Sequence, residues 1–427
     1  MISPKNFKKL SFLVYGLGST GQSVINFFKK NNIKNYKVWD DNTNDVYKKL
    51  RPKNFKKALS QTDYIVLSPG VSLVKSKKRK QLNKYKEKII TDIDLIFLLK
   101  KSFKSIVVTG TNGKSTTCKI LEHVLKKNKF KTLLGGNIGT PILSLNVKKN
   151  NFLIIEASSF QLAHSKFISP DYAILLNISN DHIDWHGNIK NYINSKLKIF
   201  SNQKKNQYSI LNFNLKKYLK KKLITKGIIP KIKDFQKLKK KINNPYLTSD
   251  INDENMMFVL SLSKLLRIKE KPFIKSLKSF VGLPHRYEIF LKKGNCTFIN
   301  DSKATSFQAT KSALKNGKNI FWIVGGLPKK NDKFNITNVR KNIIKSYIIG
   351  KNTNFFRNQL QNKVSIFISK NLKNSVIKIL KDINSFKRKN NTILFSPASA
   401  SFDQYLNFEE RGNSFKKLCK YYARKYV

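Results

Sequence analysis

Several features that would place a protein in a simple class are missing from this chain of 427 residues. Its three cysteines lie far apart and are odd in number, so neither a disulfide framework nor a zinc site is indicated. No apolar run reaches the roughly 18 residues of a membrane span. The short hydrophobic start of the chain runs into a glycine motif and not into a signal cleavage site. We therefore expect a cytoplasmic protein with no membrane insertion.

Acidic residues and arginine are also scarce. The chain has 24 Asp and Glu against 85 Lys and Arg, a formal net charge of +61. Such a charge can indicate a nucleic-acid partner, because basic patches neutralise phosphates. Lysine is, however, spread over the whole chain beside abundant Asn, Ile, Phe and Tyr, the bias of AT-rich codons. We expect no specific nucleic-acid partner. A basic nucleic-acid-binding protein stays as an alternative, because residues 216–241 are dense enough in lysine to attract polyanions.

The clearest positive signal is a predicted strand at residues 107–109 that runs into a glycine-rich turn ending in Gly-Lys-Ser. Glycine lets backbone N–H groups point at an anion, and the positive end of the next helix lies at the same place. Lys114 can reach the terminal phosphates of a nucleoside triphosphate, and the Ser115 hydroxyl can hold Mg²⁺. The motif is shortened, because Val108 stands where the full pattern has glycine. The loop residues are Gly110, Thr111, Asn112, Gly113, Lys114, Ser115 and Thr116.

A second apolar run, residues 151–159, carries Glu156 near its end. Ligands of open α/β sheets gather beyond the carboxyl ends of the strands. An acid at a strand end is most often only solvated, but beside the phosphate loop we expect Glu156 to share a metal ion with Ser115. His182 follows a later strand and is a candidate metal ligand or phosphate contact.

Another glycine motif lies near the start of the chain. Residues 10–15 predict a strand that enters a Gly-x-Gly-x-x-Gly turn at residues 16–21, and residues 36–41 predict a second strand that ends in acid. This pattern is typical of half of a Rossmann domain. By itself it favours a dinucleotide with Asp40 on the ribose, but any nucleotide that carries a diphosphate can use the same turn. Residues 64–70 predict a third strand with a tight turn.

The whole chain reads as an α/β protein of about three domains, each able to bury its own core. We expect a Rossmann-like N-terminal domain at residues 1–92 and a central P-loop ATPase-type domain with a mostly parallel sheet at residues 93–282. The alternation of strands with lysine-rich amphipathic helices then predicts a Rossmann-like C-terminal domain at residues 283–427. The further strands expected are residues 172–177, 319–324, 346–349, 365–369 and 392–395, with helices over residues 255–280.

Seven separated blocks need a common explanation. They are residues 110–116, 135–139, 156–162, 177–184, 282–286, 300–305 and 396–404. In this order they resemble the Mur ligase family, and the resemblance covers nearly the whole chain. Residues 403–412 favour the branch that adds D-glutamate, because relatives that add other amino acids differ most in the C-terminal domain.

The resemblance implies an ATP-dependent ligase that joins D-glutamate to UDP-N-acetylmuramoyl-L-alanine in peptidoglycan precursor synthesis. In such ligases ATP converts a substrate carboxylate into an acyl phosphate, which an amine then attacks. Both steps build negative charge, so metal ions and cations surround the transferring phosphoryl group. The implied cofactors are ATP and Mg²⁺ at two sites, and we expect a monomer.

The family pattern also implies the metal ligands. Ser115 and Glu156 would hold one Mg²⁺, and His182 would hold the second together with a carbamylated lysine that matches Lys196. A carbamate forms on a neutral amine, hence on a lysine that is buried or flanked by cations. Lys198 is the alternative position. Lys114, His182 and Lys196 are thus the expected catalytic residues.

The remaining ligands are assigned by the same resemblance. The first glycine motif would bind uridine diphosphate, and Lys329 would pair with a D-glutamate carboxylate, a role that Lys330 could exchange with it. The implied sets are Ser19, Thr20, Asp40, Asp41 and Gly70 for the UDP-sugar, with Asn137 and Ser158 near its activated carboxylate; Asn252, Asn255, Arg286, Asp301 and Lys303 for the adenine nucleotide; and Thr305, Lys329, Ser401 and Phe408 for D-glutamate.

Two departures and several alternatives stay open. Trp185 stands where relatives commonly carry arginine, and residues 202–248 match the family least. Another Mur-type or a folylpolyglutamate-type ligase is the nearest alternative. An NAD-dependent oxidoreductase would explain only residues 16–41, and a nucleic-acid-binding protein would explain only the charge.

Overall fold

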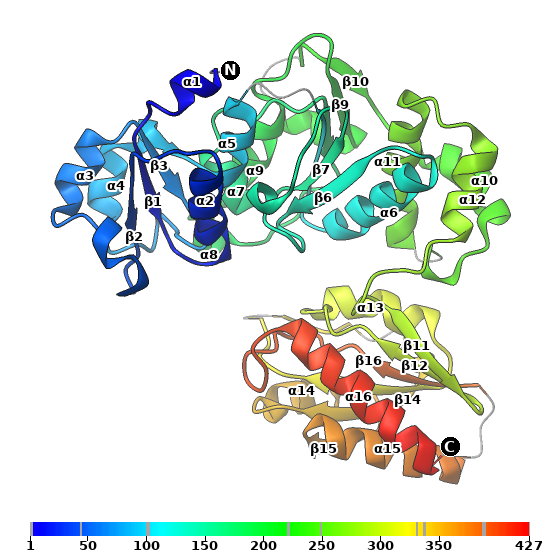
Figure 1. The fold of residues 1–427 in the computed structure, drawn as a ribbon. Helices are drawn as coiled ribbons and strands as arrows, with labels where there is room; N and C mark the ends of the chain where they lie inside the picture. Colours follow the sequence, from blue (N-terminus) through cyan, green and yellow to red (C-terminus); the bar gives the residue numbers. More distant parts are fainter. Residues whose placement is uncertain are drawn as a thin grey trace. The chain divides into compact units, whose positions relative to one another are not determined.

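The structure is a computed structural model that describes residues 3–42, 45–99, 103–219, 223–247, 250–329, 332–335, 339–386 and 390–426. Its strands form three sheets of four, six and six strands (Figure 1). The chain divides into two compact units, residues 1–244 with 252–280 and residues 245–251 with 281–427. The predicted α/β class with mostly parallel sheets is confirmed. Within the described ranges, no helix combines the length and the apolar character needed to cross a membrane.

The first sheet and its helices comprise β1 (Phe12–Tyr15), α2 (Ser19–Lys30), β2 (Tyr36–Trp39), α3 (Phe55–Gln61), β3 (Tyr64–Leu67), α4 (Arg79–Lys84), β4 (Ile89–Ile90) and α5 (Asp92–Leu98), after a short α1 (Pro4–Phe7). The strands are parallel in the order β2-β1-β3-β4. Phe12 and Val14 pack with α2 and α5 on one face, whereas Leu13 and Tyr15 pack with α3 and α4 on the other. Both faces are therefore covered, as the two-residue period of a strand allows.

The second sheet belongs to the same unit. Its elements are β5 (Lys104–Thr109), α6 (Lys114–Lys127), β6 (Thr132–Gly136), β7 (Phe152–Glu156), α7 (Ser159–His164), β8 (Tyr172–Leu175), α8 (Ile183–His186), α9 (Ile189–Leu197), β9 (Tyr208–Leu211), β10 (Lys226–Ile228), α10 (Ile232–Ile242), α11 (Asp250–Leu265) and α12 (Glu270–Lys278). All strands pair in parallel in the order β10-β9-β8-β5-β7-β6. Because β5 and β7 are neighbours, the loops that follow them share one edge of the sheet.

Two buried acids of α5 attach the first sheet to the second. Asp94 accepts hydrogen bonds from Ser165 Oγ at 2.6 Å and from the Phe167 backbone N–H at 2.8 Å, just beyond α7. Asp92 accepts from Gln161 Nε2, with 3.3 Å to each carboxylate oxygen. One apolar cluster also runs through both sheets. The contacts thus do not separate the two predicted N-terminal domains, and the boundaries at residues 92 and 282 stay predictions.

Burial of Asp92 gives the stability of this junction a pH dependence. Burial raises the pKa of Asp92 from 3.8 to about 6, against the opposing effect of the Gln161 hydrogen bond. Between these values the folded chain keeps a proton that the unfolded chain releases, so stability falls as the pH rises towards 6. The variant Asp92→Asn cannot ionise. The melting temperature of Asp92→Asn minus that of the parent is therefore expected to be larger at pH 7 than at pH 5. The increase should correspond to roughly 1 kcal/mol in the free energy of unfolding.

Differential scanning calorimetry of both proteins at the two pH values measures this difference. Asp63→Asn is the matched control, because hydrogen bonds from Ser11 lower the pKa of Asp63 and leave it ionised at both values. If Asp92→Asn and the parent differ in melting temperature by the same amount at both pH values, the raised pKa of Asp92 is contradicted.

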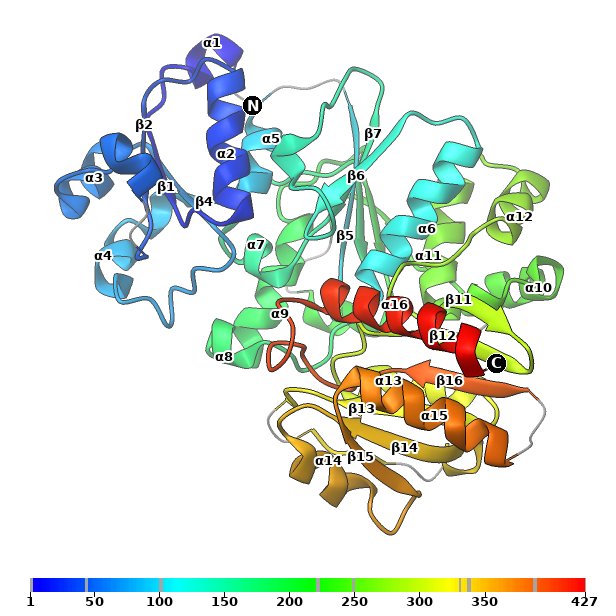
Figure 2. The same cartoon turned by 60° about the horizontal axis from the view of Figure 1, so that its bottom comes forward.

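The third sheet forms the second unit. Its elements are β11 (Glu288–Lys293), β12 (Cys296–Asn300), α13 (Phe307–Asn316), β13 (Ile320–Gly325), β14 (Ile343–Ile349), α14 (Thr353–Leu360), β15 (Ile366–Lys370), α15 (Leu372–Phe386), β16 (Asn391–Phe395) and α16 (Phe408–Tyr426). The order is β11-β12-β16-β13-β14-β15, with only β11 antiparallel to its neighbour among the described strands. Helices α15 and α16 lie side by side on one face (Figure 2), and α13 and α14 cover the other.

Candidate active site

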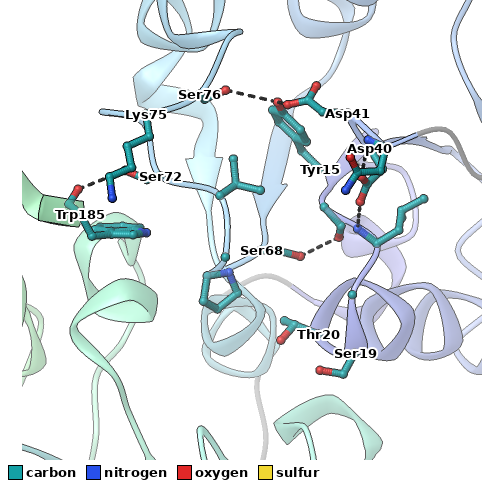
Figure 3. Close-up of a pocket in the computed structure, with 17 residues that line it drawn as sticks. Tyr15, Ser19, Thr20, Asp40, Asp41, Ser68, Ser72, Lys75, Ser76 and Trp185 are labelled. Atoms are coloured by element: carbon teal, nitrogen blue, oxygen red, sulfur yellow. Dashed lines mark hydrogen bonds between the residues drawn. The ribbon is translucent and has the colours of Figure 1, made fainter. Parts of the chain in front are cut away.

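A cavity of about 710 Å³ lies at the carboxyl ends of β1, β2 and β3. The turns after these strands form most of its wall, and Trp185 of α8 completes it (Figure 3). The position agrees with the rule that parallel sheets bind ligands beyond their strand ends. Five residues assigned to the UDP-sugar line this one cavity: Ser19, Thr20, Asp40, Asp41 and Gly70.

The first glycine turn is tightly packed against the sheet. Gly16 has φ +93°, and Ser68 Oγ donates to its carbonyl oxygen at 2.7 Å. A Cβ at Gly21 would lie 2.0 Å from the same oxygen, so a larger residue cannot stand there. Glycine at these two positions brings the start of α2 close to β1, the geometry in which a helix N-terminus faces a phosphate group.

The two acids after β2 are held by donors that line the cavity or lie beside it. Asp40 Oδ2 accepts from the Leu17 backbone N–H at 2.6 Å. Asp41 accepts from the Tyr15 hydroxyl at 2.6 Å and from Trp39 Nε1 at 3.1 Å. Burial and the bond to Asp41 raise the pKa of Tyr15 above its usual value. Both carboxylates are therefore fixed in direction before any ligand binds.

The predicted phosphate loop joins β5 to α6. Gly113 precedes α6 with φ +82°, and a Cβ there would lie 2.1 Å from Asn255 Oδ1. Asn255, assigned to the adenine nucleotide, thus adjoins the loop. Lys114 Nζ donates to the carbonyl oxygens of Gly110 and Thr111, at 2.9 Å each. The lysine amine and the positive end of α6 consequently lie on the same turn.

The segment after β8 supports this loop from outside. The backbone N–H of Thr111 donates to the Asn177 carbonyl oxygen at 3.0 Å, and that of Asn112 donates to Asn177 Oδ1 at 2.9 Å. The Tyr192 hydroxyl lies 2.8 Å from Thr111 Oγ1, and burial raises the pKa of Tyr192 to about 12. Sequence reasoning missed Tyr192, because a tyrosine within a helix gives no signal until the fold places it.

Lys196 and Lys198 point to different places. Lys196 is 1% exposed, and its Nζ donates to the Gly110 carbonyl oxygen at 2.8 Å. Lys198 Nζ donates to the carbonyl oxygen of Ala163. Burial, reinforced by nearby Lys114, lowers the pKa of Lys196 to about 6. Burial lowers the pKa of both lysines, which favours the neutral amine that carbamylation requires, but only Lys196 lies at the phosphate loop.

Glu156 is buried at the end of β7. Its Oε1 accepts from Asn137 Nδ2 at 2.8 Å, which brings together two residues of the predicted site. Its Oε2 is buried and, within the described part of the chain, has no hydrogen-bond partner. A buried carboxylate oxygen without a partner is costly, and a metal ion is one means of satisfying it. Ser115 lies in the first turn of α6, beyond the neighbouring strand β5.

His182 and Ser158 lie at the starts of two short helices. His182 precedes α8 with φ +53°, and its ring lies 4.7 Å from that of Phe160. Its side chain is 45% exposed, so a ligand could reach it. Ser158 caps α7, where its hydroxyl oxygen accepts from the Gln161 backbone N–H at 3.2 Å. This capping role exists independently of any substrate contact.

In the second unit, several residues predicted for the adenine nucleotide and for D-glutamate lie around the carboxyl ends of β12 and β16, whereas Asn252 and Asn255 belong to the first unit. Asp301 accepts from the Tyr287 backbone N–H at 3.0 Å and from Ser396 Oγ at 2.7 Å, and burial raises its pKa to about 6. Lys303 Nζ lies 3.6 Å from the centre of the Phe408 ring. Thr305 follows in the same loop, Arg286 lies before β11, and Ser401 follows β16. Lys329 is exposed, whereas its alternative Lys330 lies outside the described residues.

Arg411 holds this region together and was not among the predicted site residues. It is 1% exposed and donates to the carbonyl oxygens of Ser302, Ser399 and Ala400 at 2.8, 2.9 and 3.1 Å. Burial lowers its pKa to about 10. One guanidinium thus joins the loops after β12 and β16 to α16. Arg411 belongs to residues 403–412, but the sequence did not indicate that it is buried, since an arginine on a helix is usually solvated.

Comparisons with known families match both sheets of the first unit. Residues 108–265 match the Mur ligase middle domain, and residues 10–90 match the N-terminal domain described as Mur ligase MurD-like. These two ranges contain the phosphate loop and the first cavity.

Curated relatives match over almost their full length. Proteins described as UDP-N-acetylmuramoylalanine–D-glutamate ligase are 34% identical in Rickettsia prowazekii, covering 97% of this chain and 98% of the relative. A relative of the same description in a Buchnera aphidicola from Acyrthosiphon pisum is 36% identical, covering 97% and 99%. Another in the Wolbachia of Brugia malayi is 34% identical, covering 96% of each.

Solved structures share the fold at low sequence identity. The MurF ligase of Thermotoga maritima in complex with ADP has a TM-score of 0.57 and 16% identity, covering 99% of this chain and 100% of that one. The UDP-N-acetylmuramate-alanine ligase MurC of the same organism has a TM-score of 0.56 and 17% identity, covering 97% and 100%. Both likenesses support the arrangement of sheets described above.

Proposed function

Because this chain belongs to the Mur ligase family, with UDP-N-acetylmuramoylalanine–D-glutamate ligases as its full-length relatives, we propose that it joins D-glutamate to UDP-N-acetylmuramoyl-L-alanine with ATP. One observation carries the chemistry: the amines of Lys114 and Lys196 both donate to the carbonyl oxygen of Gly110 in the phosphate loop. The ammonium of Lys114 and the N–H groups of this loop make a site for a highly charged phosphate chain, and Lys196 lies close enough to place a metal ligand beside it.

The reaction proceeds in two steps, formation of an acyl phosphate and then of the amide. A carboxylate oxygen of the UDP-linked substrate attacks the terminal phosphorus of ATP, and ADP leaves. The amine of D-glutamate then attacks the carbonyl carbon of this acyl phosphate, loses a proton and expels inorganic phosphate. Lys114 and the N–H groups of the loop hold the phosphates through both steps, because negative charge develops on the transferred group.

We assign two Mg²⁺ ions to this region. Ser115 and Glu156 would hold the first, since Glu156 Oε2 is the buried oxygen left without a partner among the described residues. His182 and Lys196 would hold the second, with Lys196 converted to a carbamate by addition of its neutral amine to carbon dioxide and loss of a proton. Bound Mg²⁺ would neutralise phosphate charge and polarise the transferring group.

The other ligands are assigned by region. Residues 1–92 would bind the UDP-sugar in the first cavity, residues 93–282 would bind ATP, and residues 283–427 would bind D-glutamate. We further propose a monomer with no specific nucleic-acid partner. Asn137 and Ser158 would face the activated carboxylate. The adenine nucleotide would contact Asn252, Asn255, Arg286, Asp301 and Lys303, and D-glutamate would contact Thr305, Lys329, Ser401 and Phe408.

A ligation assay tests the proposal. Purified protein is supplied with ATP, Mg²⁺ and UDP-N-acetylmuramoyl-L-alanine, and with D-glutamate, L-glutamate, L-lysine or meso-diaminopimelate as the amine. Phosphate release and mass spectrometry of the product are expected to show coupling with D-glutamate alone. A faster reaction with another amino acid, or with a folate substrate, would assign the chain to a different ligase. Turnover that requires RNA or DNA would contradict the absence of a nucleic-acid partner.

A further inference from the structure

Trp185 connects the first cavity to the second sheet. Every other described residue that lines the cavity belongs to residues 15–76, whereas Trp185 lies on α8. Figure 3 shows its indole at the cavity wall beside Lys75. Its exposure is intermediate, so part of the ring remains accessible from the cavity.

The position of this indole is fixed on several sides. The Trp185 carbonyl oxygen accepts from Ser72 Oγ at 3.1 Å, and neighbouring Asp184 pairs with Lys75 at 2.6 Å. The indole packs on the ring of Phe160, with 4.7 Å between centroids, and on that of His186, with 4.6 Å. A ring held in this way loses little freedom when a ligand packs on it, which favours binding.

The same aromatic rings lead from the cavity to the phosphate loop. Phe160 contacts both Trp185 and His182, each with 4.7 Å between centroids. His186 lies 5.3 Å from Tyr192, whose hydroxyl reaches Thr111 of the loop at 2.8 Å. Trp185 thus lies between the cavity and the residues that support the phosphate loop.

We propose that Trp185 determines specificity by packing its indole against the sugar ring of the UDP-linked substrate. The inference rests on the proposed function, which places a diphosphate at the glycine turn and the reacting carboxylate at the phosphate loop. The sugar lies between these two groups in the substrate, as Trp185 does in the protein. Indole offers a large, flat and rigid surface, which suits the C–H face of a pyranose ring. The diphosphate and uridine would be bound by the N-terminal residues of the cavity.

Binding measurements with two ligands separate this role from a structural one. UDP and UDP-N-acetylmuramoyl-L-alanine are titrated by calorimetry into the parent, Trp185→Leu and Trp185→Phe. In Trp185→Leu the Kd of the sugar-bearing ligand is expected to rise about tenfold, the loss typical of one large apolar contact. The Kd of UDP, which lacks the N-acetylmuramoyl ring, is expected to stay within about twofold. Trp185→Phe keeps a smaller aromatic face and is expected to lie between the parent and Trp185→Leu.

Each other outcome overturns the proposal. Unchanged affinity for both ligands would mean that the indole does not contact the substrate. Equal weakening of both would mean that Trp185 only supports the cavity. If Trp185→Leu does not fold, Trp185→Phe decides, because it must still weaken the sugar-bearing ligand selectively. These titrations need no turnover, whereas failure of the proposed function would appear separately, as a parent protein that forms no product with D-glutamate.

Discussion

Lys114→Ala is expected to lower the rate of ligation on the order of 10³-fold while the melting temperature changes little. The amine of Lys114 lies on the carbonyl oxygens of Gly110 and Thr111 within the loop itself, so its removal takes a cation from the phosphate site and not from the core. Phosphate release at saturating D-glutamate and UDP-N-acetylmuramoyl-L-alanine measures the rate, and titration with a non-hydrolysable ATP analogue measures nucleotide binding.

Lys119→Ala is the matched control. Lys119 lies on the same helix, and its ammonium pairs with Glu122 at 3.0 Å in a partly buried contact between residues one turn apart. We expect Lys119→Ala to keep the parental rate. A Lys114→Ala variant with near-parental turnover would contradict the phosphate site, and equal losses in both variants would indicate a general effect of charge on α6.

The sequence predicted the fold correctly where a strand leads directly into a glycine-rich turn. The strand and turn around residues 10–21, like those around residues 107–116, were placed correctly because an apolar run followed by glycine has few other structures. The antiparallel strand β11 beside β12 and the short strands β4, β6, β9 and β10 were not predicted. Strands β4, β6, β9 and β10 are two to five residues long, and β10 and β11 contain lysine, so their apolar patterns are weak. Pairing with neighbouring strands, not local propensity, stabilises them.

The candidate site was predictable where residues adjoin a turn, and not where distant segments meet. The five residues assigned to the UDP-sugar line one cavity because they belong to turns after adjacent strands. Tyr192, Arg411 and Trp185 act through contacts with segments far away in the sequence, so no local motif marks them. Trp185 was noticed in the sequence only as a departure from the family pattern.

The choice between Lys196 and Lys198 shows the same limit. Two residues along a helix turn the side chain by roughly 200°, so the two lysines face opposite directions. In a chain with so many lysines the residue type favours neither, and only the family resemblance favoured Lys196 over Lys198. The structure separates them, because one amine reaches the carbonyl oxygen of Gly110 and the other that of Ala163.

Lys196→Ala is accordingly expected to lose most ligation, by roughly 10²-fold or more, whereas Lys198→Ala keeps most of it. A carbamate on Lys196 would turn a buried amine into an anion beside the phosphate loop, where it would attract the second Mg²⁺ next to His182. Alanine removes both the carbamate and the side chain that carries it. Steady-state rates at saturating Mg²⁺ and bicarbonate measure the loss.

Chemical rescue then distinguishes a carboxylate function from a simple loss of packing. Alanine at position 196 leaves space for formate or acetate, and such an ion can supply the oxygen ligands that the carbamate would have given. Added formate or acetate should therefore partly restore turnover in Lys196→Ala and leave Lys198→Ala unaffected. Guanidinium or methylammonium, which would replace an amine, should restore neither. Rescue by a cation would mean that Lys196 acts as an ammonium group on the phosphates, and near-parental turnover of unsupplemented Lys196→Ala would place the metal ligand elsewhere.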